Sequence, residues 1–467
     1  MHTPDPRRTT AAAAGAGTTA NGDTGPAPSA VSAPPPGATA GDARAAGSPA
    51  TGADDASHPR VGWTEGEVPH TARWRSESGA PAPRRVVVGD DRMTADAAYK
   101  LVCEGTAVLW RGDYHNARQL LQAMARRADR KRSARKRRRG ATGPATPVAG
   151  DQGAPDEPPA RAFHLHRKAQ AQRARLLGML LVPLEPGPDA DAGPRVPLRR
   201  APDVGAACRE AWGADAAAEP AVISLRELLG LIGAHEWRRK GVPIPALGGE
   251  RVHAYYGVFS PVRGEYVDLV AEAPLPAGAR EVAFDIGTGT GVLAALLARR
   301  GVRRVVATDQ DPRALACARE NATRLGVAER VEVRAADLFP PGRAPLVVCN
   351  PPWVPARPSS PVEYAVYDPD SRMLRGFLDG LAAHLAPGGE GWLILSDLAE
   401  HLGLRTRAEL LHLIDAAGLR VLDRLDTRPR HGRATDPTDP LHAARAAEVT
   451  SLWRLTAISG APPSVTA

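Results

Sequence analysis

The feature that most constrains this chain is a regular alternation of short apolar runs and amphipathic segments between about Glu281 and Leu422. Apolar runs of this length are typical of buried strands, and the segments between them have the length and periodicity of helices. Strands that alternate with helices form a parallel sheet, because each crossover between parallel strands needs a dozen or more residues. We therefore predict an α/β fold with a mainly parallel sheet in this region.

The first strand of this region, Val282 to Ile286, runs into a glycine-rich loop in the stretch DIGTGTG. Such a loop lies at the carboxyl end of a parallel strand, where α/β sheets bind ligands. A dinucleotide fingerprint would place its third glycine at Val292, and Asp285 would repel a pyrophosphate. A ligand with a sulfonium or ammonium charge would instead be attracted, which favours S-adenosylmethionine as the cofactor. The glycines that allow close approach to the backbone are Gly287, Gly289 and Gly291.

Acids also follow the next two strands. The second strand ends on Asp309, whose carboxylate could accept hydrogen bonds from both hydroxyls of a ribose. Asp311 has a structural explanation, because Asp311-Pro312 is a typical helix start with the acid at the N-cap. After the third strand comes Asp337, which could accept a hydrogen bond from an adenine amino group. Apolar walls for the adenine would come from the next two residues, Leu338 and Phe339.

The fourth strand, Leu346 to Cys349, ends on the sequence NPPW at residues 350–353. Asn-Pro and Pro-Pro pairs are typical of a turn, but prolines also present carbonyl groups without N–H groups. The side chain of Asn350 and the backbone carbonyl of Pro351 could together accept both hydrogens of one planar NH2 group. Trp353 could stack on the flat group that carries it. Holding both hydrogens would aim the nitrogen lone pair, and such positioning speeds a displacement.

These motifs resemble those of class I S-adenosylmethionine-dependent methyltransferases with an N/D-P-P-Y/F/W motif. The resemblance covers about residues 255–456 and is strongest to the methyltransferase small domain group, which includes glutamine-N5 methyltransferases and methyltransferases of exocyclic amines of bases. It implies a Rossmann-like seven-stranded sheet with helices on both faces and an antiparallel last strand. Tyr is the commoner fourth residue of the motif, so Trp leaves the target open. The implied catalytic residues are Asn350, Pro351, Pro352 and Trp353.

The resemblance also implies a cofactor-covering segment, GVFSPVRGEYVDLV, at residues 257–270. Its expected contacts with the methionine end of the cofactor are Phe259, Pro261 and Glu265. Asn350 is expected to line the cofactor site as well, because it lies beside the glycine loop. The other expected cofactor contacts are three acids, three glycines and one leucine: Asp285, Asp309, Asp337, Gly287, Gly289, Gly291 and Leu338.

The rest of the chain differs in composition. Residues 1–90 hold few large apolar side chains and predict a disordered leader, and residues 458–467 predict a disordered tail. Residues 91–248 predict a mainly helical domain with a Gly/Pro-rich linker at 140–160. In that domain Thr94 is a plausible N-cap, and Ser224 with Glu227 fits a capping box. Residues 249–457 form the predicted methyltransferase domain.

Charge is concentrated in one stretch. Arg126 to Arg139 contains ten Lys or Arg and one Asp, whereas the whole chain has a net charge of only +8, so the remainder is close to neutral. Such a run is most often a solvated segment, but it can also contact RNA or DNA. The four cysteines and the histidines show no metal-ligand spacing, so no metal site is predicted. No apolar stretch is long enough for a membrane span, and we expect a cytoplasmic protein.

The sequence therefore predicts an N-methyltransferase that acts on a planar NH2 nitrogen and uses S-adenosylmethionine. A protein glutamine and a nucleic-acid base are both open as targets, with a small molecule third. The alternative is a nucleic-acid-binding or assembly protein with a non-catalytic methyltransferase-like fold. The intact series of acids and glycines favours the enzyme, because a decayed site would be expected to lose one of them.

Overall fold

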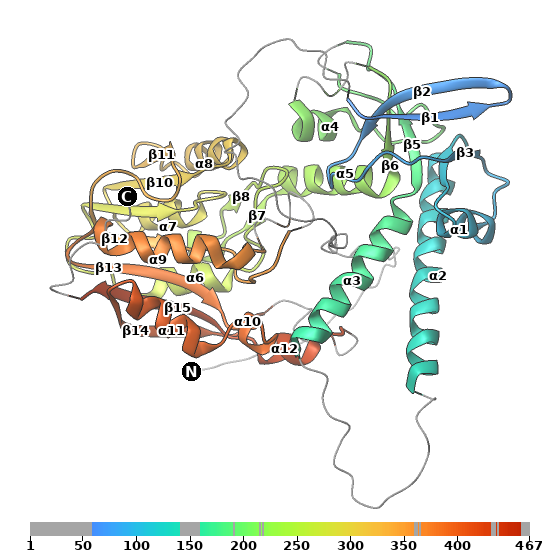
Figure 1. Cartoon of the computed structure of the whole chain (residues 1–467). Helices are drawn as coiled ribbons and strands as arrows, with labels where there is room; N and C mark the ends of the chain where they lie inside the picture. Colours follow the sequence, from blue (N-terminus) through green and yellow to red (C-terminus); the bar gives the residue numbers. More distant parts are fainter. Residues whose placement is uncertain are drawn as a thin grey trace, which may run out of the picture.

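Each half of the chain folds around its own β-sheet (Figure 1). The structure is a computed structural model that describes residues 58–140, 159–189, 192–213, 216, 219–358, 363, 366–430, 436 and 439–458. The N-terminal sheet has six strands and the C-terminal sheet has seven. Between them in sequence lie a short antiparallel ribbon and one 3-10 turn, β7 (Val242–Pro243), η2 (Pro245–Leu247) and β8 (Arg251–Val252).

The N-terminal sheet is mixed and has the strand order β1-β2-β6-β5-β4-β3. Strands β1 and β2, and likewise β5 and β6, pair antiparallel, whereas the other neighbours pair parallel. The strands are β1 (Arg60–Glu65), β2 (Val68–Arg75), β3 (Val86–Gly89), β4 (Ala107–Trp110), β5 (Leu180–Leu184) and β6 (Ala221–Ser224). The helices are α1 (Ala95–Cys103), α2 (Tyr114–Gly140), α3 (Pro159–Leu177), α4 (Gly205–Trp212) and α5 (Leu225–Lys240).

The domain predicted as mainly helical at 91–248 contains helices α1 to α5, but the sheet at its centre was not predicted. Strand β4 shows why: all four of its residues are buried, so it lacks the alternation that marks a half-exposed strand. Val108 and Trp110 pack into the core beneath the helices, whereas Ala107 and Leu109 pack into a second core on the other face of the sheet. A short apolar run buried on both faces cannot be told from part of a helix by its periodicity.

The predicted leader at 1–90 was also wrong for residues 58–90, which supply β1, β2 and β3. Val61, Ala72 and Trp74 are buried against partners more than 30 residues away in sequence, including Leu181 and Val222. These few apolar side chains are enough for order because the sheet supplies the rest of the core. Residues 1–57 and 459–467, where disorder was also predicted, lie outside the described residues, as does most of the predicted linker, 141–158.

Two local predictions in this domain had different outcomes. Thr94 caps α1 as expected, since its side-chain oxygen accepts a hydrogen bond from the backbone N–H of Ala97. Ser224 is the N-cap residue of α5 but makes no capping hydrogen bond, so the predicted capping box is wrong. Its partner Glu227 instead accepts hydrogen bonds from the hydroxyls of Ser76 and Ser78, which follow β2. The Glu227 carboxylate therefore binds the loop after β2 and does not take part in a capping box.

The C-terminal sheet has the order β11-β10-β9-β12-β13-β15-β14, in which only β15 runs against its neighbours. This confirms the predicted seven-stranded sheet with an antiparallel last strand. The strands are β9 (Val282–Ile286), β10 (Arg304–Asp309), β11 (Val331–Ala335), β12 (Ala344–Cys349), β13 (Leu385–Ser396), β14 (Leu419–Thr427) and β15 (Thr450–Ala457). The helices are α6 (Glu265–Glu272), α7 (Val292–Arg299), α8 (Pro312–Arg324), α9 (Arg372–His384), α10 (Leu398–His401), α11 (Arg407–Ala416) and α12 (His442–Ala447), with the 3-10 turn η4 (Pro369–Ser371).

Helices cover both faces of this sheet, as the α/β prediction requires. Helices α6, α7 and α8 enclose one core, which includes Ala283 and Val348 from the central strands. Helices α9 and α11 enclose the other, which includes Phe284 and Val347. Val242, Ile244 and Leu247 also belong to the first core, so the domain begins slightly before the predicted boundary at 249. Among the described residues, none of the helices is both long and apolar enough to cross a membrane.

The predicted basic run belongs to α2, which continues to Gly140. Helix α3 contacts α2 near the N-terminal sheet and runs from there toward α12, whereas α2 extends from the sheet in a different direction (Figure 1). Arg173 of α3 pairs with Asp129 of α2 at 2.9 Å. We call this pair of helices the α2–α3 hairpin.

Candidate active site

The predicted site residues lie together at the carboxyl ends of the parallel strands of the C-terminal sheet. Strands β9 and β12 are parallel neighbours, with Cys349 opposite Ile286. The glycine loop and the NPPW sequence therefore leave adjacent strands at the same end. Strand β10 pairs with the other side of β9, with Thr308 also opposite Ile286, so Asp309 joins them. Loops that are distant in sequence thus form one continuous rim.

The glycine loop needs its glycines for conformation and for space. Gly287, Gly289 and Gly291 have φ angles of 69°, 53° and 79°, a left-handed region that other L-residues rarely adopt. A Cβ atom built on Gly289 would have only Val258 Cγ1 near it, at 4.0 Å. The backbone is thus accessible at Gly289, and the cofactor-covering segment, to which Val258 belongs, lies over it.

Asp285 lies beneath this loop and is 1% exposed. Its Oδ2 accepts hydrogen bonds from the Thr288 hydroxyl at 2.6 Å and from the backbone N–H of Ala294 at 3.0 Å. Burial raises the pKa of Asp285 to about 6, although both hydrogen bonds act in the opposite direction. The carboxylate therefore joins the loop to the first turn of α7, a role that the sequence pattern did not reveal.

Asp309 is half-buried and tied to the backbone through both oxygens. Gly289 N donates to Oδ2 and Asp311 N donates to Oδ1, each at 3.0 Å. Burial raises the pKa of Asp309. Each carboxylate oxygen can accept a further hydrogen bond, so the side chain retains capacity for a pair of hydroxyls. Asp311 caps α8 by accepting from Arg313 N, which confirms its predicted structural role.

Asp337 is exposed and accepts a hydrogen bond from Gln310 Nε2 at 2.6 Å, which joins the loops after β10 and β11. The next residue, Leu338, has a φ of 70°, and its carbonyl accepts from the Thr308 hydroxyl. Phe339 turns toward α9 and stacks on His384, with ring centroids 4.3 Å apart. Leu338 and Asp337 therefore remain candidates for an adenine pocket, while Phe339 packs on α9.

Helix α9 makes room for these two apolar residues with glycines one turn apart. A Cβ atom at Gly376 would lie 2.7 Å from Leu338 Cδ1, and one at Gly380 would lie 2.5 Å from Phe339 Cε2. Larger side chains at these positions would push the loop after β11 outward. The two glycines of RMLRGFLDGLAAH are the sequence signal for this close approach.

At NPPW, Trp353 Nε1 donates a hydrogen bond to Asn350 Oδ1 at 2.9 Å. The indole ring also packs against three apolar clusters. The guanidinium carbon of Arg263 lies over the ring, 4.8 Å from its centroid. A planar target could therefore stack only on the opposite face of Trp353 while Arg263 stays in place.

Arg263 is held by two buried carboxylates. Its Nε pairs with Glu265 Oε1 and its Nη2 pairs with Glu448 Oε1, both at 2.9 Å. Glu448 also accepts from the Ser396 hydroxyl at 2.6 Å, and its Oε2 has no hydrogen-bond partner among the described residues. This cluster joins the cofactor-covering segment to the start of β15 and to NPPW. Glu265 was expected to contact the cofactor, and in this structure it orients Arg263.

The N-terminal domain holds the start of the cofactor-covering segment. Tyr256 is buried in the core of the N-terminal domain, one residue before the segment begins. Tyr255 donates to Glu320 of α8 at 2.5 Å, and Arg238 of α5 lies over the Tyr255 ring at 3.6 Å. Phe259 lies farther along and packs on the core of the C-terminal domain. Both domains therefore hold the start of this segment.

Asn321 fastens the glycine loop to α8, a role that was not predicted from the sequence. It is fully buried in α8, and its Nδ2 donates to the carbonyls of Thr290 and His253, at 3.0 and 3.1 Å. Its Oδ1 accepts from His253 N at 2.9 Å. An asparagine in the middle of a helix is unfavourable without such partners, so its presence in ARENATR was a usable signal.

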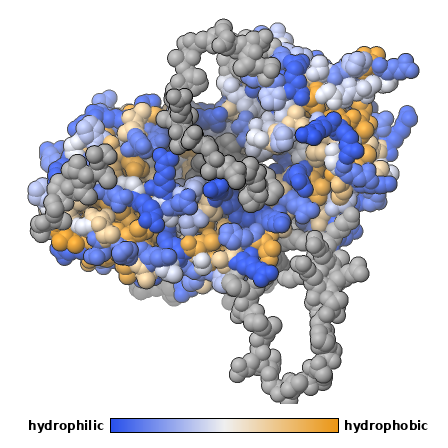
Figure 2. Space-filling model, in the orientation of Figure 1, coloured by the Kyte–Doolittle hydropathy of each residue, from blue (hydrophilic) through white to orange (hydrophobic). Residues whose placement is uncertain are grey.

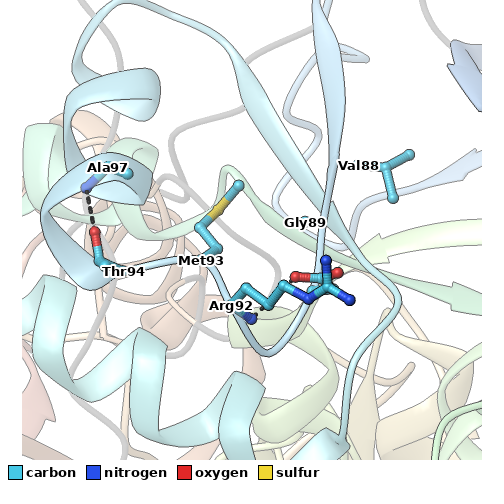
Figure 3. Close-up of a pocket in the computed structure, with 7 residues that line it drawn as sticks. Val88, Gly89, Arg92, Met93, Thr94 and Ala97 are labelled. Atoms are coloured by element: carbon cyan, nitrogen blue, oxygen red, sulfur yellow. Dashed lines mark hydrogen bonds between the residues drawn. The ribbon is translucent and has the colours of Figure 1, made fainter.

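Two cavities in the described part of the chain lie away from this rim, and none of the predicted site residues lines them. One, of about 420 Å3, lies between the end of β3 and the start of α1 (Figure 3). Its polar groups include Thr94, which already accepts the α1 capping hydrogen bond from Ala97 N. Another, of about 550 Å3, lies between the end of α4 and the start of α8, with Trp212 and Tyr255 in its wall. It belongs to the contact between the domains.

Comparison with known proteins supports a relation for the C-terminal domain. Residues 251–406 match the family model described as the methyltransferase small domain. The release factor glutamine methyltransferase of Cereibacter sphaeroides is 37% identical over 164 residues, which are 32% of this chain and 56% of that protein. The ribosomal protein L11 methyltransferase of Pelotomaculum thermopropionicum is 40% identical over 144 residues, 30% of this chain and 39% of that protein.

The chain thus spans about half the length, or less, of these curated relatives. A solved structure of geranyl diphosphate methyltransferase in complex with SAM aligns with 42% of this chain and 85% of its own, at 15% identity and a TM-score of 0.32. The residues before 251, including the whole N-terminal sheet and the α2–α3 hairpin, lie outside the family match.

Proposed function

We propose that this protein methylates an NH2 nitrogen on a planar group and uses S-adenosylmethionine as the donor, a proposal supported by the match of residues 251–406 to the family model described as the methyltransferase small domain. One observation carries the proposal: the register of β9 and β12 places the glycine loop and NPPW on the same rim. A donor site and an acceptor site must be neighbours for direct transfer between them.

The residues on the rim fit the cofactor. The open backbone at Gly289 allows close approach, and Asp309 retains acceptor capacity for ribose hydroxyls. Asp337 and Leu338 would contact the adenine, and Phe259 would contact the methionine end, with Glu265 acting there through Arg263. When bound, S-adenosylmethionine supplies a methyl group already activated on a sulfonium. The protein then needs to position the acceptor more than it needs a strong base.

The acceptor side consists of Asn350 and Pro351. The Asn350 carbonyl oxygen has a second lone pair beyond the one used by Trp353, and the Pro351 carbonyl would supply the other acceptor. Together they would hold both hydrogens of the NH2 group. Pro352 fixes the backbone that follows, since its ring restricts φ and removes an N–H group. The nitrogen lone pair would then face the donor side.

Two kinds of target carry such a group, the side-chain amide of a protein glutamine and the exocyclic amine of a base. The name of the C. sphaeroides relative supports a glutamine target. The positive charge of the α2–α3 hairpin, which lies outside the family match, supports a nucleic-acid target. Both targets use the same acceptor chemistry.

The test is methyl transfer from radiolabelled S-adenosylmethionine into a fractionated cell lysate, with Asn350→Ala as the variant. We expect this variant to retain cofactor affinity in calorimetry and to lose transfer, because Asn350 is proposed to hold the acceptor nitrogen. Asp309→Ala is the matched control that should lose both. Full transfer by Asn350→Ala would refute the acceptor mechanism. Loss of the label on nuclease or on protease treatment would identify the target class.

A further inference from the structure

The α2–α3 hairpin concentrates the positive charge of the protein. Helix α2 carries 11 Lys or Arg residues and one acid, Asp129, and α3 carries five and no acid. The net charge of the entire chain is only +8, so the rest of the protein is acidic by comparison. Figure 2, in the orientation of Figure 1, shows mainly hydrophilic residues where α3 lies. The hairpin is therefore a strongly charged element on an otherwise mildly acidic protein.

Helix α3 presents a basic stripe along one face. Residues three or four apart lie on the same face of a helix, and the exposed polar residues of α3 follow this spacing over almost its whole length. The stripe extends about 21 Å at the rise of an α-helix. The opposite face contributes the buried residues Phe163 and Leu177. The stripe consists of Arg161, His164, Lys168, Gln172 and Arg175.

Within the part of the chain that the structure describes, Lys168 and Arg175 of the stripe and Arg126 on α2 make no ion pair with a carboxylate. Two other arginines of α3 are paired: Arg173 with Asp129 and Arg167 with Glu363. The paired arginines hold the hairpin together and fix it to the C-terminal domain. The unpaired cations repel one another and are free to meet an anion.

Helix α3 begins beside NPPW. Phe163 packs with Val354, which directly follows Trp353, and Trp353 packs against the same cluster. One helical turn farther along, Arg167 donates to the carbonyl of Arg357 at 2.9 Å and lies over the Tyr367 ring at 4.1 Å. Helix α3 is therefore docked on the segment that follows NPPW through the face opposite the stripe. A ligand bound along the stripe would reach the acceptor site by passing around the start of α3, about one helix diameter of 10–12 Å.

We propose that the α2–α3 hairpin binds the phosphodiester backbone of a nucleic acid and presents one of its bases to Asn350. This deepens the proposed function and rests on it for the methyl transfer, though not for the binding. A nucleic-acid strand carries a phosphate about every 3.4 Å, so the stripe spans roughly six nucleotides. An acidic peptide would need an equally dense row of carboxylates to match it. An exocyclic base amine is the planar NH2 group that such a ligand offers.

The binding test uses the full chain and the triple variant R126Q/K168Q/R175Q. Fluorescence anisotropy is measured with single-stranded RNA and with duplex DNA of about 20 nucleotides or base pairs, at salt concentrations from about 50 to 200 mM. Loss of three phosphate contacts should weaken RNA binding by about 100-fold near 0.1 M salt and reduce the salt slope by about 2. The stronger of the two probes identifies which nucleic acid is bound.

The matched control is R84Q/R303Q/R420Q, which removes the same charge from exposed arginines outside the hairpin. It should bind RNA and DNA within about threefold of the wild type, since long-range effects on exposed charges are screened. Equal losses in both triple variants, or no loss in either, would overturn the hairpin as the binding site. Displacement of the probe by an equal concentration of poly-glutamate would overturn the assignment to a nucleic acid.

The binding and methyl-transfer measurements separate this inference from the proposed function. The hairpin variant should keep the wild-type affinity for S-adenosylmethionine, because its three residues lie outside the cofactor loops. Label that enters only protease-sensitive, nuclease-resistant material would overturn a nucleic acid as the substrate. Hairpin-dependent RNA binding with no label in any fraction would refute the methyl transfer and leave the binding site intact.

Discussion

The indole Nε1 of Trp353 donates a hydrogen bond to Oδ1 of Asn350, with 2.9 Å between the two atoms. The side-chain amide of Asn350 is therefore oriented by a residue three positions along the chain. The bond identifies the oxygen of the amide group and leaves that oxygen one further acceptor position. Trp353 thus has a positioning role that does not depend on stacking with a target.

Replacement of Trp353 by Phe tests this role. The variant keeps an aromatic ring in the apolar clusters but removes the N–H donor, so the Asn350 amide can rotate. The net value of one such hydrogen bond is about 0.5–1.5 kcal/mol, and we expect kcat to fall by roughly 2- to 10-fold with unchanged cofactor affinity. Steady-state kinetics and calorimetry provide the measurement. An unchanged kcat would show that the bond has no part in catalysis.

Replacement of Asp309 by Asn should weaken cofactor binding. Both carboxylate oxygens accept backbone N–H groups at 3.0 Å, and an amide would turn its NH2 group toward one of these donors. Loss of a charged acceptor typically costs about 1.5–3 kcal/mol, or roughly 10- to 100-fold in the dissociation constant. Asp311→Asn is the control, because Asn is an equally good N-cap and should leave cofactor affinity unchanged. Similar losses in the two variants would contradict a specific role for Asp309.

The buried carboxyl group of Asp285 predicts a pH dependence of stability. Its pKa is about 6 in the folded protein and about 4 in an unfolded chain, so the folded state holds a proton between these pH values that the unfolded state has lost. The resulting stabilisation is complete below about pH 4 and is lost as the pH rises through 6.

Asp285→Asn should remove this dependence, because its amide oxygen can still accept from Thr288 and Ala294. The unfolding free energy of the wild type, measured by urea denaturation relative to the variant, should fall by about 3 kcal/mol between pH 4 and pH 7. The comparison cancels the other titrating groups. A constant difference over this range would show that Asp285 is ionised throughout.

The ion pairs of Arg263 predict that stability lost in one variant can be partly restored by a second substitution. Arg263→Ala leaves two buried carboxylates, Glu265 and Glu448, without their cation, and we expect a loss of about 3–5 kcal/mol in the free energy of unfolding. Adding Glu448→Gln removes one of the two charges and should restore part of the loss. Arg303→Ala is the control, since Arg303 pairs with Glu281 on an exposed surface and should lose less than about 1 kcal/mol. Additive losses in the double variant would mean that the pair is not coupled.

Local sequence signals predicted the C-terminal domain well. The alternation of apolar and amphipathic segments predicted its strands and helices, and the Asp311-Pro312 start of α8 was confirmed in atomic detail. The glycine loop follows a buried strand as expected. These predictions depend on residues within a few positions of one another, where the chain itself sets the spacing.

The sequence by itself determined the βαβ order of the C-terminal half, the composition of its loops and the concentration of charge in α2. Tertiary structure alone decided the N-terminal sheet, in which Arg73 of β2 pairs with Ala221 of β6. It also decided that Glu227 would bind Ser76 and Ser78 instead of capping α5, and that Arg263 would lie over Trp353. The physical reason is the same in each case: a buried strand, carboxylate or cation is stabilised by partners brought close in space, and periodicity carries no information about partners so distant in sequence.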